Sequence, residues 1–305
     1  MRVAVVGGVC KDIFGKEERF GGITYNCIAG ARLNKKVVAI TKAGKEDLMK
    51  WRNIMEKNGV KVIGKEDRTT KLKTMYKDEK RIQIPVSLSS RIEKVGIESE
   101  LIHFNPLFEN QVSMDAIKEG RKKSKIVSLD VQGFVRHAVI GKRIEHKPMK
   151  NAKEILRNVD LLKISDIELE YVLSGLEGSV VKVDGIFEHI KGLKKIANSG
   201  PSIVELTYGR KGSMVYWREK GETIFFPAFA TKNVDETGAG DVFSIVFAIM
   251  FAESNSIKEA GMFATVASSF CVEMPAYHGI PDEKKILERV KEYERRICVE
   301  RFDGV

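Results

Sequence analysis

The chain has 305 residues, of which 43% are hydrophobic, 8% aromatic and 31% charged, and this composition excludes a collagenous, low-complexity or disordered protein. A single core of this size can bury roughly three quarters of the extended chain's surface, so stability requires neither disulfides nor metals. The four cysteines, Cys10, Cys27, Cys271 and Cys298, form no CxxC pair. We therefore expect reduced thiols.

The net charge of +10 would suit a nucleic-acid-binding protein, but the 52 basic residues are interleaved with 42 acidic ones. The densest basic stretch, residues 121–125, is typical of a solvated helix end, and a basic surface equally suits a small anion such as a nucleotide. No apolar run reaches the roughly 18 residues of a membrane span, and no signal peptide follows Met1. We expect a cytoplasmic protein with neither nucleic-acid nor membrane partners.

Apolar, strand-like runs alternate with amphipathic, helix-length stretches along most of the chain. We expect helices at residues 26–33 and about 48–58, and strands at 3–6, 36–40, 126–129, 159–164 and 203–206. Strands separated by helices predict an α/β fold, a doubly wound and mostly parallel sheet flanked by helices, in one domain over residues 1–305. Ligands of such sheets bind at the carboxyl ends of the strands.

Residues 69–86 break this rhythm, because polar and apolar residues alternate around the turn signal at residues 77–79. The pattern predicts a half-exposed β-hairpin, and residues 14–22 are candidates to pair with it. We expect a small antiparallel β lid, inserted at about residues 12–24 and 67–88. The alternative is a surface hairpin with no moving part. Exposed lid edges would also allow a homodimer.

The most informative segment is NVDETGAGDVF at residues 233–243. Small residues at Gly238, Ala239 and Gly240 lead into an apolar run at residues 242–251, which predicts a helix. The unpartnered first N–H groups of a helix, together with its dipole, form an anion site. Asp241 falls beside it, where a carboxylate can accept a proton from a hydroxyl that attacks a phosphate. The alternative is an ordinary helix start, and neither a Walker A loop nor a GxGxxG fingerprint is present.

The DETGAGD run, followed by Val-Phe, resembles the signature of the ribokinase-like (PfkB) family of sugar and nucleoside kinases. Further segments match that family in order: GGVCKD at 7–12, FGGITYN at 20–26 and TYGRKGS at 207–213. The hairpin also falls where the family inserts its lid strands, and the resemblance runs from about residue 3 to about residue 280. It implies a carbohydrate kinase that uses ATP and Mg²⁺.

The resemblance also implies roles for individual residues. Asp241 would be the catalytic base, and the amides of residues 238–240 would form the anion hole for the transferring phosphoryl group. Carboxylate and amide side chains suit the binding of hydroxyls because they fix them directionally. The residues implied to hold the acceptor hydroxyls are Asp12, Gly21, Gly22 and Asn26.

The nucleotide side is implied by a second set of residues, namely Ser165, Thr207, Gly209, Lys211 and Gly212. Residues 272–279, including His278, would border the adenine, with an ordinary surface histidine as the alternative for His278. Ser165 and Glu168 occupy the family's Asn-x-x-Glu element, which makes Glu168 the magnesium-linked carboxylate. Ser-x-x-Glu is also a helix capping box, and that alternative stays open for Ser165. Potassium, which some relatives bind through backbone groups of residues 235–240 and 276–279, also stays open.

The segment LDVQGFVR at residues 129–136 resembles the DVQG-x-x-R stretch of archaeal and plant members that act on myo-inositol and related polyols. It would place Asp130, Gln132 and Arg136 near the substrate. The alternative is a strand-end loop in which Arg136 pairs with Asp130.

The expected substrate is therefore a small polyhydroxylated sugar or cyclitol, with myo-inositol as the narrowest candidate. Cys10 stands where ribose-specific members carry Asn, which argues against a simple ribokinase. Phe14, Phe20 and Tyr25 keep a nucleoside kinase open as an alternative. A non-catalytic regulator that binds a sugar or nucleotide is the other alternative.

Overall fold

The computed structural model describes residues 1–77, 80–296 and 300–302, and within them ten strands form one sheet. Its order is β16-β15-β14-β13-β12-β9-β8-β1-β4-β5. The strands from β5 to β13 in this order run parallel, and β14 to β16 extend the sheet with antiparallel pairs. The bounds are β1 (Arg2–Gly7), β4 (Lys36–Ala43), β5 (Lys61–Glu66), β8 (Ser99–Asn105), β9 (Ser124–Asp130), β12 (Leu161–Ser165), β13 (Ile203–Thr207), β14 (Gly212–Trp217), β15 (Glu222–Pro227) and β16 (Glu300–Arg301).

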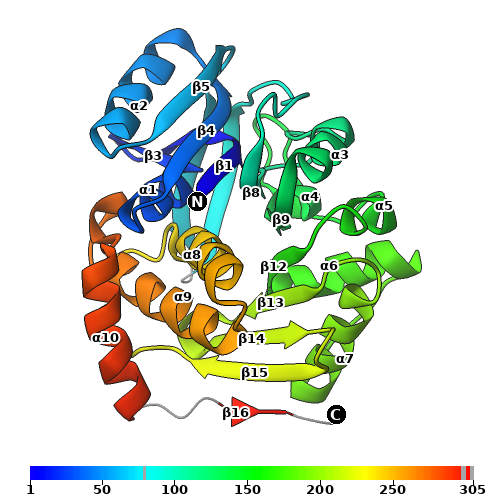
Figure 1. Ribbon diagram of the computed structural model, residues 1–305. Helices are drawn as coiled ribbons and strands as arrows, with labels where there is room; N and C mark the ends of the chain where they lie inside the picture. The colour runs from blue at the N-terminus through cyan, green and yellow to red at the C-terminus, as the bar shows by residue number, and fades with distance from the viewer. Residues whose placement is uncertain (78–79, 297–299, 303–305) are drawn as a thin grey trace.

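Helices cover both faces of this sheet (Figure 1) and build two separate apolar cores. The first layer contains α1 (Thr24–Arg32), α2 (Lys45–Lys57), α8 (Ala239–Ser254), α9 (Ile257–Cys271) and α10 (Glu283–Arg296). The second contains α3 (Met114–Lys123), α4 (Gln132–Val135), α5 (Ala152–Leu156), α6 (Asp166–Glu177) and α7 (Ile186–Ala197). Two 3₁₀ turns, η1 (Gly209–Lys211) and η2 (Ala276–Gly279), lie in loops. The predicted doubly wound α/β sheet is confirmed.

Helix α8 lies at the centre of the first layer, against α1 and α9. Its residues from Val242 to Met250 are all buried, as expected for a helix that is apolar on every side. The helix begins at Ala239, three residues before the predicted apolar run. The glycine-rich segment is therefore the start of a helix whose middle part is fully buried in this layer.

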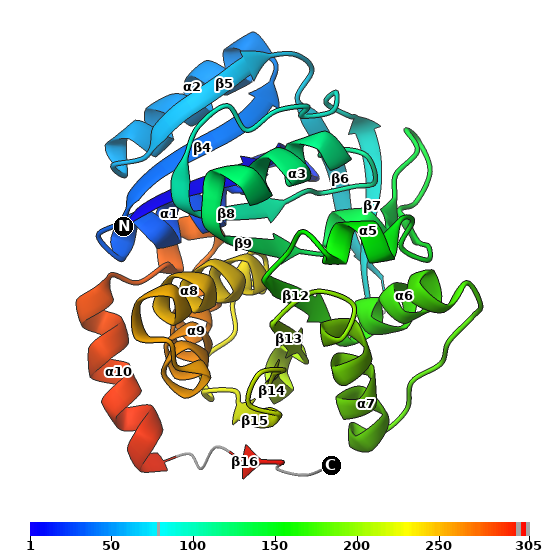
Figure 2. The same cartoon turned by 45° about the vertical axis from the view of Figure 1, so that its right-hand side comes forward.

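A second, four-stranded sheet, which we call the lid sheet, has the order β3-β2-β6-β7. Its strands β6 and β7 are labelled in Figure 2. It consists of β2 (Val9–Phe14), β3 (Glu17–Gly22), β6 (Thr70–Lys77) and β7 (Lys80–Ser87). The predicted hairpin is present as β6 and β7, although the turn residues Asp78 and Glu79 lie outside the described residues.

The pairing within the lid sheet differs from the prediction. Residues 17–22 pair with β2 and not with the hairpin, and β2 joins β6 in parallel, with Asp12 opposite Leu72. The lid sheet is therefore mixed. Because β2 directly follows β1, the chain passes from the large sheet into the middle of the lid sheet, a long-range pairing that local sequence patterns do not show.

One edge of the lid sheet is covered by the loop between β10 (Arg136–His137) and β11 (Glu145–His146). The amides of Gly141 and Ile144 donate to the carbonyl oxygens of Pro85 and Gln83 on β7, at 2.9 and 3.0 Å. This loop occupies the edge of β7, so strand addition in the predicted homodimer would have to use β3.

Two further expectations concern the cysteine thiols and the membrane-spanning segments. Cys10, Cys27 and Cys271 are free and buried, and Cys298 lies outside the described residues. Among the helices of the described segments, none combines the length and apolar character that crossing a membrane requires.

Candidate active site

The glycine-rich loop ends in the first turn of α8. Gly238 has φ +84°, and a Cβ at this position would lie 2.1 Å from the ring of Tyr25, so only glycine satisfies both the backbone and the space. Ala239 N donates to the Glu236 carbonyl at 3.3 Å. In the described part of the chain, the amides of Gly238, Gly240 and Asp241 have no partner. The loop therefore offers free N–H groups where the sequence predicts an anion site.

Asp241 is held at both its side chain and its main chain. Its Oδ1 accepts a hydrogen bond from Asn105 Nδ2 at 2.7 Å, and Gln132 Nε2 lies 3.5 Å away. Its carbonyl oxygen accepts from Asn26 Nδ2 at 2.8 Å and Ser244 Oγ at 3.0 Å. No donor among the described residues reaches Oδ2. The carboxylate is thus oriented through one oxygen while the other stays available.

The surroundings of Asp241 shift its titration. Burial and the nearby Asp130 charge raise the pKa of Asp241 to about 7, although Lys163 and the Asn105 bond act in the opposite direction. A carboxylate whose pKa lies near the ambient pH is well matched to accepting a proton from an alcohol.

Asp12 lies in β2 of the lid sheet, where its carboxylate is buried. A Cβ on Gly21 would come within 2.6 Å of Asp12 Oδ2, so this glycine makes room for the carboxylate. Asp12 Oδ1 accepts hydrogen bonds from Thr74 Oγ1 at 3.1 Å and Gln83 Nε2 at 3.0 Å, and Arg81 Nη2 lies 3.5 Å from it. Both lid segments therefore meet at this side chain.

A continuous run of hydrogen bonds connects Asp12 to Asp241. Gln83 Oε1 accepts from Arg136 Nη2 at 2.5 Å, and Arg136 Nη1 donates to Gln132 Oε1 at 3.2 Å. Gln132 Nε2 then donates to Asn105 Oδ1 at 2.8 Å, and Asn105 holds the Asp241 carboxylate. We call this set the polar chain; its members are Asp12, Gln83, Arg136, Gln132, Asn105 and Asp241.

The alternative in which Arg136 pairs with Asp130 is not what the structure shows. Asp130 Oδ2 instead lies 3.0 Å from Lys163 Nζ. The other carboxylate oxygen, Oδ1, accepts a hydrogen bond from the backbone N–H of Gln132 at 3.0 Å. Asp130 thus supports the loop and pairs with a buried lysine, whereas Arg136 donates to Gln83 and Gln132.

A row of ionisable residues crosses three neighbouring strands beneath the glycine-rich loop. Asp130, Lys163 and Glu205 occupy the same register on β9, β12 and β13. Burial opposes the charge of Lys163, but the Asp130 and Glu168 carboxylates raise its pKa overall. Burial raises the pKa of Glu205 well above its ordinary range, which favours the neutral acid. A Cβ on Gly240 would lie 3.3 Å from Lys163 Nζ, so the ammonium lies directly under the loop.

A cavity of about 410 Å³ opens on the other side of the loop. Phe229, Phe243 and Val272 give it apolar walls. The predicted nucleotide residues Thr207, Gly209 and Gly212 line it together with Ala239 and Gly240.

Three other predicted nucleotide residues lie elsewhere. Lys211 is exposed and is not part of the cavity lining, and Ser165 is not part of it either. His278 is exposed as well, with its ring against Tyr277.

Ser165 and Glu168 form a reciprocal cap at the start of α6. Ser165 Oγ accepts from the Glu168 amide at 3.4 Å, and Glu168 Oε2 accepts from the Ser165 amide at 2.7 Å. The capping-box alternative for Ser165 is therefore present. In the described segments, no group of three or more His, Cys, Asp or Glu residues is placed to hold a metal. These residues fit only a Mg²⁺ ion that takes most of its ligands from water and donor phosphates, which is how proteins commonly bind it.

Asp235 ties three segments together. Its carboxylate accepts from the Thr237 amide at 2.9 Å and the Ala276 amide at 3.1 Å, and it pairs with Arg19 Nη1 at 3.0 Å. The glycine-rich loop, η2 and the lid strand β3 therefore meet here. Potassium binding at this junction stays a prediction.

Several residues of the site have no counterpart in the sequence-based prediction, among them Asn105, Lys163 and Gln83. Asn105 ends the strand LIHFN, and Lys163 stands in the apolar strand LLKIS. A polar residue within or at the carboxyl end of an apolar strand is the signal that marks both. Gln83 alternates with apolar residues on β7, so its position facing Asp12 depends on the lid pairing.

Part of the chain matches a known protein family. Residues 129–279 match the model of the pfkB family of carbohydrate kinases. The chain carries a pfkB family carbohydrate kinase domain. This confirms the predicted family and enzyme class.

Curated relatives of the kinase domain act on different substrates. A ribokinase of Arabidopsis thaliana is 29% identical over 184 residues, which are 60% of this chain and 43% of that protein. A deoxyribokinase of Salmonella typhimurium is 24% identical over 264 residues, 80% of this chain and 78% of the relative. A nucleoside kinase of Methanothermobacter thermautotrophicus is 34% identical over 101 residues, 33% of this chain and 31% of the relative. The chain therefore spans less than half of the length of the first of these relatives.

A solved structure extends the likeness over almost the whole fold. It is a pyrophosphate-dependent kinase of the ribokinase family, complexed with a pyrophosphate analog and myo-inositol. It has a TM-score of 0.79 at 25% identity and covers 94% of this chain and 99% of its own. The fold of the kinase domain is ribokinase-like.

Proposed function

We propose that this kinase transfers the terminal phosphoryl group of ATP to a hydroxyl of a small neutral polyol, with a cyclitol such as myo-inositol as the narrowest candidate. The observation that carries the proposal is the position of Asp241. It lies in the first turn of α8, next to free amides, with Oδ1 bonded to Asn105 and Oδ2 open. Oδ2 then takes the proton of the acceptor hydroxyl, and the amides stabilise the phosphoryl oxygens during transfer.

The charges around the polar chain support a neutral acceptor. Two guanidinium groups, Arg81 and Arg136, lie near two carboxylates, Asp12 and Asp241. With Asp241 ionised these charges balance, so a further fixed charge on the acceptor would be left without a partner. Amide and carboxylate groups along the chain offer directional bonds to several hydroxyls.

The cavity beside the loop supports a nucleotide as the donor. Its apolar walls include Phe229 and Phe243, which would contact a base or ribose and would have no use for pyrophosphate alone. Mg²⁺, when bound with the donor near Glu168, would neutralise phosphate charge. Lys163, fixed by Asp130 beneath Gly240, adds a positive charge from the protein side.

Phe14, Phe20 and Tyr25, the aromatic residues on which the nucleoside alternative rests, make other contacts in the structure. Tyr25 is buried against Gly238. The Phe20 ring has Lys11 Nζ 5.6 Å from its centroid, and the Phe14 ring has the Arg19 guanidinium at 5.2 Å. Two of these rings thus already have a cation over one face and the third is buried, which favours a polyol.

A coupled ADP-release assay tests the proposal on a panel of myo-inositol, ribose, fructose, adenosine and cytidine. A parallel set with pyrophosphate as donor, followed by phosphate release, tests the nucleotide. We expect the highest kcat/KM with a cyclitol or sugar and ATP, and a strongly reduced kcat in Asp241→Asn. Preference for a nucleoside would contradict the acceptor, and preference for pyrophosphate would contradict the donor. Nucleotide binding without turnover on any acceptor would favour the regulator.

A further inference from the structure

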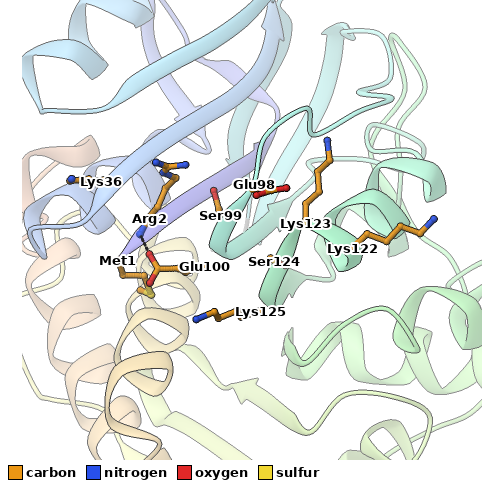
Figure 3. Close-up of a pocket in the computed structure, with 10 residues that line it drawn as sticks. All are labelled: Met1, Arg2, Lys36, Glu98, Ser99, Glu100, Lys122, Lys123, Ser124 and Lys125. Carbon is orange, nitrogen blue, oxygen red and sulfur yellow. Dashed lines mark hydrogen bonds between the residues drawn. The ribbon is translucent and has the colours of Figure 1, made fainter.

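A second hollow lies at the amino ends of the parallel strands, at the end of the sheet opposite to the polar chain. Its volume is about 600 Å³, within the range of small-ligand sites. It is lined by the first residues of β1, β4, β8 and β9 and by the last turn of α3 (Figure 3). We call it the basic hollow; its lining includes Arg2, Lys36, Glu98, Ser99, Glu100, Lys122, Lys123 and Lys125.

Cations outnumber anions in the basic hollow, and most of them are unpaired. Lys123 pairs with Glu119 at 2.7 Å. Among the described residues, no ion pair is found for the side chains of Arg2, Lys36, Lys122 or Lys125. Glu100 accepts a hydrogen bond from the Arg2 amide at 2.6 Å, drawn as a dashed line in Figure 3. Glu98 and Glu100 therefore offset only part of the positive charge that is gathered here.

Helix electrostatics account for only some of these cations. Lys122 and Lys123 lie in the last turn of α3, where positive charge is favoured by the helix dipole. Arg2, Lys36 and Lys125 stand instead at the starts of three strands, and Arg2 is directly opposite Lys36 in the sheet. Strand ends supply no comparable dipole. Their gathering around one hollow therefore has another cause.

Ser99 provides an independent indication of a ligand. This residue lines the hollow, is only 9% exposed, and its Oγ has no hydrogen-bond partner. A buried hydroxyl without a partner is costly, because it has lost its bonds to water and gained none. An anionic oxygen in the hollow could accept this hydrogen bond.

We propose that the basic hollow binds a small anion that carries several phosphates, such as an oligophosphate or the phosphate tail of a nucleotide. The unpaired cations supply the attraction, and the Ser99 hydroxyl supplies a directional bond. The site is separate from the donor cavity. It shares no residue with the polar chain, and β8 runs from Ser99 at the hollow to Asn105 at Asp241.

The test is calorimetric titration of the untagged full chain with tripolyphosphate, in the presence of saturating MgADP to occupy the donor cavity. We expect one residual site. In the variant Arg2→Gln/Lys122→Gln/Lys125→Gln its affinity should fall at least about tenfold. The matched control, Lys50→Gln/Lys57→Gln/Lys61→Gln, removes three exposed charges of α2 and β5 and should change affinity less than about twofold. Loss of equal size in both variants would show non-specific attraction and overturn the site.

Ser99→Ala separates a built site from a diffuse patch, and the buried, unpartnered hydroxyl makes this variant safe for folding. We expect about three- to tenfold weaker binding, consistent with the loss of one hydrogen bond to a charged group. Unchanged affinity in Ser99→Ala, or the absence of any residual site in the wild type, would contradict the proposal. Because binding is measured without turnover, this result does not depend on whether the proposed kinase reaction is correct.

Discussion

The two ends of the central sheet differ in how their charged side chains are paired. At the carboxyl end, Asp12, Arg136 and Asp241 are joined by hydrogen bonds into one chain, and Asp130 neutralises Lys163. At the amino end, four cations of the basic hollow, Arg2, Lys36, Lys122 and Lys125, are exposed and form no ion pair with the described residues. Buried charges must be paired to be tolerated, whereas exposed ones cost little. The net charge of +10 therefore gives no indication of the polar chain, where the charged groups are paired.

The largest expected effect is at the carboxyl end, in Asp241→Asn. Because the proposed base is lost while Asn105 keeps its bond to an amide oxygen, we expect kcat to fall by about 10² to 10⁴ with little change in KM for ATP. Steady-state kinetics checks this. Glu98→Gln at the amino end is the matched control and should stay within about twofold. Equal losses in the two variants would erase the contrast between the ends.

Gly238→Ala should lose about 10² or more in kcat, because the new methyl group collides with Tyr25 and displaces the loop. The control is Gly178→Ala, at a helix end with φ +72° and no atom within 4 Å of the added Cβ. This control has the same backbone strain, about 1–2 kcal/mol, but no collision. Thermal unfolding and kcat measured on both variants separate strain from collision. Similar activity in both would refute the steric argument.

The pKa of Asp241, raised to about 7 by burial and Asp130, predicts the pH profile. The base works only when ionised, so kcat/KM should increase about tenfold per pH unit below 7 and level off above it. The same shift affects stability. The folded form binds the proton more tightly than the unfolded chain. The contribution of Asp241 to the free energy of unfolding therefore decreases as the pH rises from about 4 to 7. Asp241→Asn should therefore melt higher than wild type, with a larger gain at pH 8 than at pH 5.

Gln83→Leu tests whether the polar chain works as a unit. It removes bonds to both Asp12 and Arg136, so we expect kcat/KM for the acceptor to fall about tenfold while KM for ATP is unchanged. Steady-state rates measured against the acceptor concentration and against the ATP concentration give the two parameters separately. An equal rise in both KM values would indicate a general loss of structure.

The smallest effect is expected for Glu205→Gln. Since burial favours the neutral acid, the amide should replace it with less than about a twofold change in activity at pH 7. Lys163→Met is the informative partner, because it leaves Asp130 unpaired and should cost far more. A large loss in Glu205→Gln would mean that Glu205 is ionised and helps to hold Lys163.

Much of the site could be predicted from the sequence because its residues follow short motifs. Asp241, Asn26, Gln132 and Arg136 each come from a predicted segment, and the structure brings them to the carboxyl end of the sheet. Their partners could not be derived in the same way. The position of Gln83 depends on β2 running parallel to β6, a pairing between distant segments that no local pattern encodes.

The charged residues inside strands were overlooked for a different reason. Alternation and apolar content identify β12 and β13 as strands whether or not one position is ionisable. Lys163 and Glu205 matter because the two strands align them in register beneath Gly240. Register is a property of the folded sheet.

The contact between Gly238 and Tyr25 has a consequence for divergence. Because the ring fills the space that any side chain at position 238 would need, a homologue can carry a smaller residue at position 25 and still keep this glycine. A side chain at position 238 would require both a smaller residue at position 25, 213 residues away in the chain, and a left-handed backbone.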